Sequence, residues 1–104
     1  MRTTPVRLGI IGCGVIGTQH IQAATACPRI TLVAIADLRE NVLRDTAAKF
    51  NIPRTYTDAG ALLADRDIEA VVLALPTAGR TALALRALAA GKHILIEKPG
   101  RSEE

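Results

Sequence analysis

Apolar residues in this chain gather in short continuous runs that alternate with stretches of helical periodicity. The runs at residues 30–36 and 68–75 are almost entirely apolar, which is typical of parallel strands buried on both faces. Elsewhere apolar residues recur three and four positions apart, which favours amphipathic helices. The pattern predicts strands at 6–11, 30–36, 52–56, 68–75 and 93–96, and helices at 15–26, 40–50, 59–64 and 79–90.

Turn-forming residues separate these predicted elements. Pro28 stops the first helix, Gly91 ends the last one, and Asp58 is a predicted N-cap. Pro53 places the third strand at an edge of the sheet, because proline cannot donate a ladder hydrogen bond. Alternating strands and helices predict an α/β fold, a doubly wound parallel sheet with helices on both faces. The length of 104 residues favours one domain, residues 1–104.

A glycine-rich stretch with the form G-x-G-x-x-G lies where the first strand meets the first helix. Gly12 allows a sharp turn, and Gly14 removes a side chain where a pyrophosphate approaches the backbone. Gly17 lets the helix pack closely on the strand. The N–H groups of the first helical turn, at Val15 and Ile16, then face the phosphate along the helix dipole. The stretch therefore predicts a dinucleotide-binding, Rossmann-type sheet.

An acidic residue, Asp37, follows the second strand twenty positions after Gly17. A carboxylate at this place accepts hydrogen bonds from the adenosine ribose and repels a 2′-phosphate, which favours NAD over NADP. Arg39 opposes that preference, because its guanidinium can pair with a 2′-phosphate. We predict NAD as the cofactor and leave NADP open. The alternative is that Asp37 merely ends a strand.

Three residues at the carboxyl end of the last strand, Glu97, Lys98 and Pro99, form a second candidate site. Ligands of open α/β sheets bind outside the carboxyl ends of the strands, so we expect Lys98 to face the cofactor. Its ammonium can polarise a hydroxyl or carbonyl group, and burial can lower its pKa enough to relay a proton. On chemistry alone, a surface Lys-Pro dipeptide is an equally good interpretation.

Composition excludes several classes of partner. Hydrophobic residues make up 49% of the chain and charged residues 22%, with a formal charge of +3. The arginines are scattered and aromatic residues are limited to Phe50 and Tyr56, which argues against a nucleic-acid surface. No apolar run approaches a membrane span, and the N-terminus lacks a signal-peptide core. Cys13 and Cys27 fit no metal spacing, and we interpret them as small buried residues in a reducing cytoplasm.

The stretches GCGVIGTQH, VAIAD and AGKHILIEKP together resemble the N-terminal domain of the Gfo/Idh/MocA oxidoreductases, relatives of glucose–fructose oxidoreductase and inositol dehydrogenase. The resemblance covers nearly the whole chain, and its most specific part is the Glu-Lys-Pro sequence at 97–99. It implies that Lys98 contacts substrate and nicotinamide and assists catalysis, and it allows a cis bond before Pro99. It also implies cofactor contacts from Gly12, Gly14, Val15, Ile16, Gly17, Asp37, Arg39, Pro76, Thr77, Glu97 and Lys98.

One stretch departs from the family pattern. Members often have T-P-x-x-x-H after the fourth strand, whereas this chain has Leu75 for the threonine and Arg80 for the histidine. Pro76 is retained and Thr77 follows it at the same strand end. Pro76 and Thr77 therefore stay candidates for contacts near the nicotinamide ribose.

The C-terminal residues Ser102, Glu103 and Glu104 are typical of a helix N-cap followed by two acids in the first turn. They predict a truncated chain whose dinucleotide-binding domain is incomplete at its C-terminal end, with a polar tail as the alternative. Family members continue into a second α/β domain that binds substrate and through which they usually associate. We therefore expect no substrate domain here, and a homo-oligomer stays open.

Three functional hypotheses follow. The first is the NAD(P)-binding portion of an oxidoreductase that transfers hydride between the cofactor and a sugar, cyclitol or similar polyol. In that case a small polyol is a partner only of a longer protein, and this chain alone is inactive. The second is a non-catalytic nucleotide-binding or redox-sensing module, which needs Asp37 but not Lys98. The third is a chain that has no stable fold.

Overall fold

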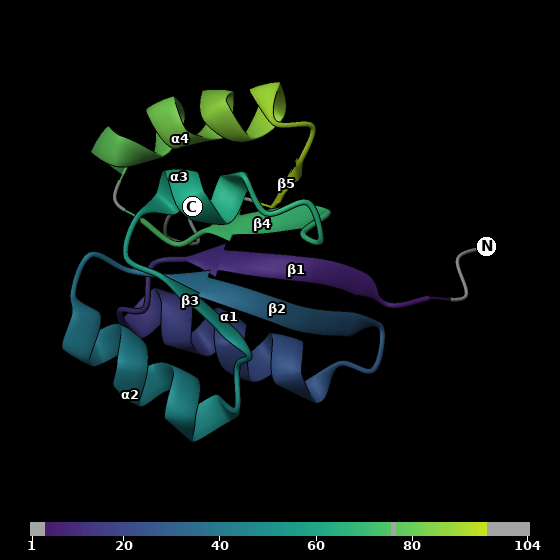
Figure 1. Cartoon of the computed structure of the whole chain (residues 1–104), viewed down its shortest axis with the longest axis vertical. Coiled ribbons are helices and arrows are strands. Elements are labelled where there is room, and N and C mark those ends of the chain that lie inside the picture. Colours follow the sequence, from purple (N-terminus) through teal and green to yellow (C-terminus); the bar gives the residue numbers. More distant parts are fainter. Residues whose placement is uncertain (1–3, 76, 96–104) are drawn as a thin grey trace, which may run out of the picture.

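The computed structural model describes residues 4–75 and 77–95, and it contains one five-stranded parallel sheet (Figure 1). The strand order is β3-β2-β1-β4-β5, so the order reverses between β1 and β4. The strands are β1 (Val6–Ile11), β2 (Ile30–Ala36), β3 (Arg54–Tyr56), β4 (Ala70–Leu73) and β5 (His93–Leu95). The helices are α1 (Val15–Ala26), α2 (Glu40–Phe50), α3 (Ala59–Leu63) and α4 (Thr77–Ala89).

Helices cover both faces of the sheet, with α1 and α2 on one side and α3 and α4 on the other (Figure 1). Successive residues of a strand point to opposite faces, so each central strand contributes to two cores. In β4, for example, Val72 belongs to the core beneath α1 and α2, whereas Val71 belongs to the core beneath α3 and α4. This arrangement confirms the predicted Rossmann-type α/β sheet with helices on both faces.

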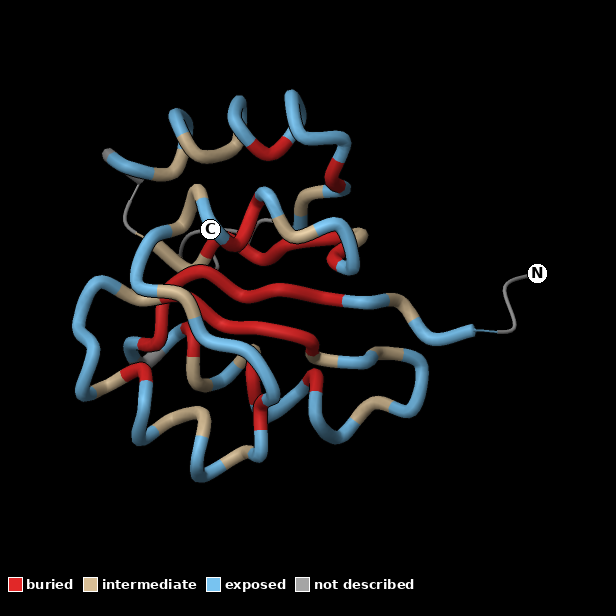
Figure 2. The backbone as a smooth tube through the Cα atoms, in the orientation of Figure 1, coloured by how far each residue is buried: buried red, intermediate tan, exposed pale blue. Residues whose placement is uncertain are grey.

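The three central strands form the most deeply buried part of the chain (Figure 2). Ile10, Ile35 and Val71, one from each of these strands, are fully buried, and Ile21 of α1 packs against the same sheet. Full burial of such a side chain contributes about 1.5–3 kcal/mol relative to exposure. The nearly continuous apolar character of β2 and β4 is therefore explained by helices on both of their faces.

Several element boundaries differ from the sequence predictions. The third strand begins at Arg54, not at 52, because Asn51 takes a left-handed conformation and the N–H of Ile52 closes the end of α2 on the carbonyl of Ala47. The fourth strand covers 70–73, because the N–H of Ile68 is used in a turn with Asp65. The fourth helix covers 77–89, two residues earlier at its start than predicted, since an internal glycine is tolerated at moderate cost.

Other predicted details are confirmed. The third strand is an edge strand, and the carboxylate of Asp58 caps α3 by accepting a hydrogen bond from the N–H of Ala61 at 3.2 Å. Gly91 has a φ of +78° just after α4, which is a conformation that favours glycine and ends the helix. Within the described residues, no helix has both the length and the apolar character required to cross a membrane.

Candidate functional site

The glycine-rich stretch turns the chain from β1 into α1, and its glycines differ in their surroundings. Gly12 has a φ of +106°, and a Cβ there would collide with the carbonyl oxygen of Ala74. A Cβ on Gly17 would collide with the carbonyl oxygen of Gly12 and lie 2.7 Å from its carbon. A Cβ on Gly14 would meet no atom within 4 Å. Gly12 and Gly17 are therefore required by packing, whereas Gly14 borders open space.

Gly14 is the N-cap of α1, with extended backbone and no capping side chain. Its carbonyl accepts the N–H of Thr18 at 2.8 Å, which starts the helix, and the hydroxyl of Thr18 donates to the carbonyl of Cys13 at 3.4 Å. The first N–H groups of a helix have no partners within it and carry the positive end of its dipole. Val15 and Ile16 supply such groups next to the open space at Gly14. An anionic pyrophosphate fits this arrangement.

Asp37 follows β2 and lies beside the glycine stretch. Its Oδ2 accepts a hydrogen bond from the N–H of Cys13 at 2.8 Å, so the carboxylate is tied directly to the loop between β1 and α1. The Arg39 guanidinium forms an ion pair with Asp37, with Nη2 2.9 Å from Oδ2 and Nε 3.0 Å from Oδ1. The Asp37 side chain is 8% exposed and that of Arg39 is 58% exposed. The structure therefore brings three predicted features together: the glycine loop, Asp37 and Arg39.

The ion pair sets the charge states in this region. Hydrogen bonds from the Arg39 side chain lower the pKa of Asp37 to about 2, against the opposing effect of burial. The same contact raises the pKa of Arg39 above its ordinary value. Burial, reinforced by the nearby negative charge of Asp37, raises the pKa of the Cys13 thiol to about 11. At neutral pH the site thus holds a carboxylate, a guanidinium and a neutral thiol, and Cys13 is not a thiolate nucleophile.

The low pKa of Asp37 has a consequence for stability in acid. A carboxyl group with a lower pKa in the folded than in the unfolded chain stabilises the fold above its unfolded value of about 4. That stabilisation is lost as the pH falls from about 4 towards 2, and we expect it to amount to about 1 kcal/mol because Arg39 is exposed. Urea unfolding at a series of pH values measures it. Asp37→Asn should lose this part of the pH dependence, whereas Asp45→Asn, on the exposed side of α2, should retain it. Parallel pH profiles for all three proteins would contradict the assignment.

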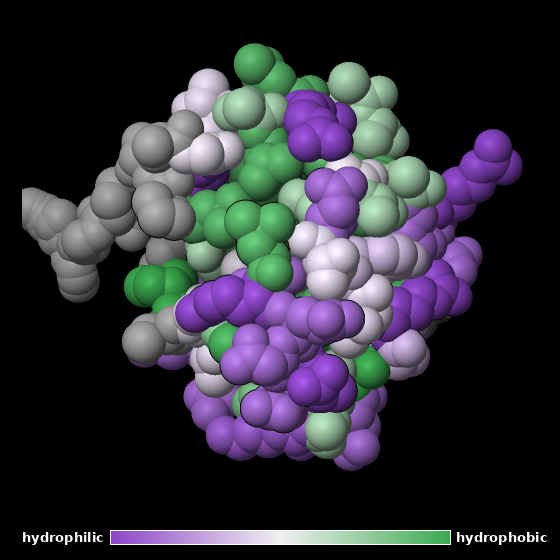
Figure 3. Space-filling view, turned by 60° about the vertical axis from the view of Figure 1, so that its left-hand side comes forward, coloured by the Kyte–Doolittle hydropathy of each residue, from purple (hydrophilic) through white to green (hydrophobic). Residues whose placement is uncertain are grey.

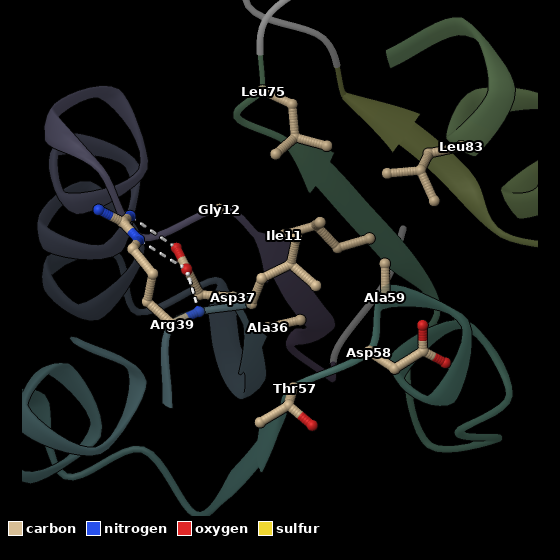
Figure 4. Close-up of a pocket in the computed structure, with 11 residues that line it drawn as sticks. Ile11, Gly12, Ala36, Asp37, Arg39, Thr57, Asp58, Ala59, Leu75 and Leu83 are labelled. Atoms are coloured by element: carbon tan, nitrogen blue, oxygen red, sulfur yellow. Dashed lines mark hydrogen bonds and ion pairs between the residues drawn. The ribbon is translucent and has the colours of Figure 1, made fainter. Parts of the chain in front are cut away.

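A pocket of about 400 Å³ opens at the carboxyl ends of the strands beside Asp37 (Figure 4). Its walls are mostly apolar. Its lining residues come from the ends of β1 and β2, the segment after β3, and the β4–α4 region: Ile11, Gly12, Ala36, Asp37, Leu38, Arg39, Thr57, Asp58, Ala59, Leu75 and Leu83. Figure 3, which brings this side of the molecule forward, shows apolar residues gathered above a hydrophilic lower part. An apolar pocket beside a carboxylate fits a purine ring joined to a ribose.

Sequence reasoning missed several of these lining residues, among them Thr57, Leu38 and Leu83. Thr57 could have been found, because it follows β3 and ligands bind at the carboxyl ends of parallel strands. Nothing in the sequence marks Leu83 as a pocket residue, since it lies in the middle of α4 and has the spacing of an ordinary core position. Its place in the pocket depends on how α4 crosses the sheet.

Other predicted site residues are only partly placed. Thr77 is the first residue of α4, next to the carboxyl end of β4. Pro76, Glu97 and Lys98 lie outside the described residues, as does the bond between Lys98 and Pro99. The prediction of two buried cysteines is right for Cys13 and wrong for Cys27, which is half-buried because it follows the last turn of α1. In the described part of the chain, histidine, cysteine and acidic side chains form no cluster of three suited to a metal ion.

Comparison with known proteins identifies the class to which this fold and site belong. Residues 6–102 match the Gfo/Idh/MocA oxidoreductase family, NAD-binding Rossmann fold. The chain belongs to this family, and the resemblance predicted from its sequence is confirmed. The cofactor class, NAD with NADP also found among the relatives, agrees with the sequence prediction.

Individual relatives are dehydrogenases and reductases. The chain is 34% identical to myo-inositol 2-dehydrogenase of Thermotoga maritima over 94 residues, which is 90% of this chain and 28% of that protein. Scyllo-inositol dehydrogenase of Lactobacillus casei, solved with NAD(H) and scyllo-inositol, superimposes with a TM-score of 0.86 at 25% identity, covering 92% of this chain and 28% of its own. A 3-ketoreductase of Actinomadura kijaniata, solved with NADP, superimposes with a TM-score of 0.85 at 35% identity, covering 92% of this chain and 30% of its own. The chain thus spans under a third of the length of these relatives.

Proposed function

We propose that this chain is the NAD-binding portion of an oxidoreductase that moves hydride between a nicotinamide cofactor and a secondary alcohol of a sugar, cyclitol or similar polyol. The observation that carries the cofactor part is the open space at Gly14, next to the N-terminus of α1 and the Asp37 carboxylate. The pyrophosphate would lie at Gly14, Val15 and Ile16, and the adenosine ribose at Asp37. The adenine ring would occupy the apolar pocket between Leu38 and Leu83.

The chemical part of the proposal concerns Lys98. When bound, the nicotinamide supplies the hydride acceptor or donor. In the proposed role, Lys98 polarises the substrate hydroxyl, Glu97 contacts the cofactor, and Pro76 and Thr77 contact the nicotinamide ribose. The inositol and galactose dehydrogenases among the relatives support a polyol substrate.

We further propose that the whole catalytic cycle needs a longer protein, since the relatives are about three times the length of this chain. The free thiols Cys13 and Cys27 support a reducing compartment, the cytoplasm.

Thermal unfolding of the purified chain with and without dinucleotide tests the cofactor part. A ligand that binds only the folded state stabilises it by about 2.7 kcal/mol at one hundred times its Kd. We therefore expect the unfolding temperature, measured by scanning calorimetry, to rise with added NAD, and the chain to produce no NADH from polyols. AMP and nicotinamide mononucleotide serve as half-cofactor controls, and AMP should stabilise more. Unfolding that is insensitive to every nucleotide would overturn the proposed cofactor site, and steady NADH production would overturn the need for a longer protein.

A Lys98→Ala substitution separates the enzyme from a non-catalytic nucleotide sensor. Introduced into a longer protein that carries a substrate domain, it should abolish turnover and change NAD binding far less, because Lys98 acts on the reacting hydroxyl and is one of many proposed cofactor contacts. Arg29→Ala, an exposed cation in the α1–β2 turn, is a suitable control. A Lys98 variant with unaltered turnover would contradict the proposed role.

A further inference from the structure

The Asp37 carboxylate has its hydrogen-bonding positions filled by donors from the chain itself, and Figure 4 shows those that Arg39 supplies. Oδ1 accepts the N–H of Arg39 at 2.9 Å and its Nε at 3.0 Å. Oδ2 accepts the N–H of Cys13 at 2.8 Å and the Arg39 Nη2 at 2.9 Å. A carboxylate offers about four lone-pair positions, so four donors leave none for a ligand.

These four donors fall into two kinds. Two are backbone N–H groups, one in the glycine stretch and one at the N-cap of α2, and they fix the orientation of the carboxylate. The other two belong to the Arg39 guanidinium, which is 58% exposed. Within the described part of the chain, the Arg39 side chain makes its hydrogen bonds and its ion pair with Asp37. A cation at a helix N-terminus gains nothing from the dipole, so Asp37 alone retains it there. The guanidinium can therefore leave while the carboxylate stays in place.

We infer that Arg39 competes with NAD for Asp37, by holding the two acceptor positions that the ribose hydroxyls require. Nε and Nη2 are adjacent donors in one plane, and a ribose diol likewise presents two adjacent O–H donors to one carboxylate. This inference rests on the proposed function, since it takes Asp37 as the ribose site. It gives Arg39 a role in weakening NAD binding that sequence reasoning did not assign.

A 2′-phosphate reverses the effect of Arg39. The phosphate ester removes one hydroxyl donor and brings negative charge, which the carboxylate repels and a guanidinium binds strongly. With NADP, Arg39 would turn from Asp37 to the phosphate and supply a favourable contact. The Arg39 side chain therefore weakens the binding of NAD and strengthens the binding of NADP. As a result, Asp37 and Arg39 together discriminate between the two cofactors less than Asp37 would alone.

Calorimetric titration of Arg39→Ala with NAD and with NADP tests this inference. We expect NAD to bind about two- to fivefold more tightly than to the unchanged chain, which matches the release of an exposed ion pair. NADP should bind about tenfold more weakly or worse, because a charge-assisted contact is lost. Arg66→Ala removes the same charge from an exposed loop near the amino ends of the strands, and both affinities should stay within about twofold of the unchanged chain.

The outcomes separate this inference from the function on which it rests. Loss of positive charge alone would weaken both anionic cofactors, so weaker or unchanged NAD binding by Arg39→Ala would overturn the competition. Equal changes for NAD and NADP would overturn it as well. If the unchanged chain binds neither dinucleotide, the proposed function fails, and the inference fails with it. Without ligand, Arg39→Ala should lose no more than the small stabilisation that its ion pair with Asp37 provides, and Arg66→Ala should unfold like the unchanged chain.

Discussion

Replacing Gly17 with alanine is expected to destabilise the chain by at least about 3 kcal/mol. The added Cβ would collide with the carbonyl oxygen of Gly12 and lie 2.7 Å from its carbon. Both are backbone atoms at the end of β1, the central strand of the sheet, so relief requires either α1 or the turn after β1 to move. Urea unfolding followed by circular dichroism at 222 nm, a standard helix wavelength, measures the loss.

Gly14→Ala is the matched control for this prediction. The same side chain is added three residues earlier, where it would meet no atom within 4 Å and where the φ of −75° suits any residue. Its effect on unfolding should stay within about 1 kcal/mol. Its effect on NAD binding should be larger, because the methyl group enters the space proposed for the pyrophosphate. Equal stability of the two variants would contradict the packing role given to Gly17.

Replacing Lys92 with methionine is expected to cost about 2–3 kcal/mol of unfolding free energy. Lys92 is buried, with 8% of its surface exposed, and its Nζ donates to the carbonyl oxygens of Asp65 at 2.7 Å and Ile68 at 2.6 Å. These bonds join the turn before β5 to the loop before β4. Methionine preserves much of the side-chain volume but cannot donate, so two carbonyl oxygens would lose a charged donor. Urea unfolding measures the difference.

Lys49→Met gives the comparison for Lys92. Lys49 lies on the exposed side of α2, where its Nζ is 5.4 Å from the centre of the Phe50 ring. An exposed cation–π contact contributes about 0.5–1 kcal/mol, so this variant should lose no more than that. If both lysine variants unfold alike, the buried hydrogen bonds of Lys92 do not carry the stability assigned to them.

The sequence allowed the sheet and its main helices to be predicted because their apolar pattern reflects burial directly. β2 and β4 are covered on both faces, and their sequences are correspondingly apolar throughout. The packing roles of Gly12 and Gly17 were also predictable, since each follows from backbone geometry at a strand-to-helix turn. Gly12 and Gly17 indeed approach other backbone atoms, and Gly14 borders open space.

Contacts to the main chain were not predictable in the same way. The acceptors of Lys92 are carbonyl groups 24 and 27 residues earlier, and every residue carries a carbonyl, so no residue type marks them. The N–H of Cys13 reaches Asp37 across 24 residues for the same reason. Arg39 was recognised as a candidate for phosphate binding, but its pairing with Asp37 depends on the turn between β2 and α2. The sequence therefore identified which residues belong to the site. Only the structure showed which hydrogen bonds and ion pairs they form with one another.

The central position of β1 also decides how firmly the glycine-rich stretch between β1 and α1 is held. β1 is paired with both β2 and β4, and its side chains enter both cores. Local opening that exposes edge strands or helix ends leaves such a strand intact, and only global unfolding releases it. Gly12 directly follows this strand. The glycine-rich stretch is therefore attached to the part of the chain that unfolds last. The N–H groups of this stretch are thus preorganised for the anion binding that we propose, and little conformational entropy would remain to be lost.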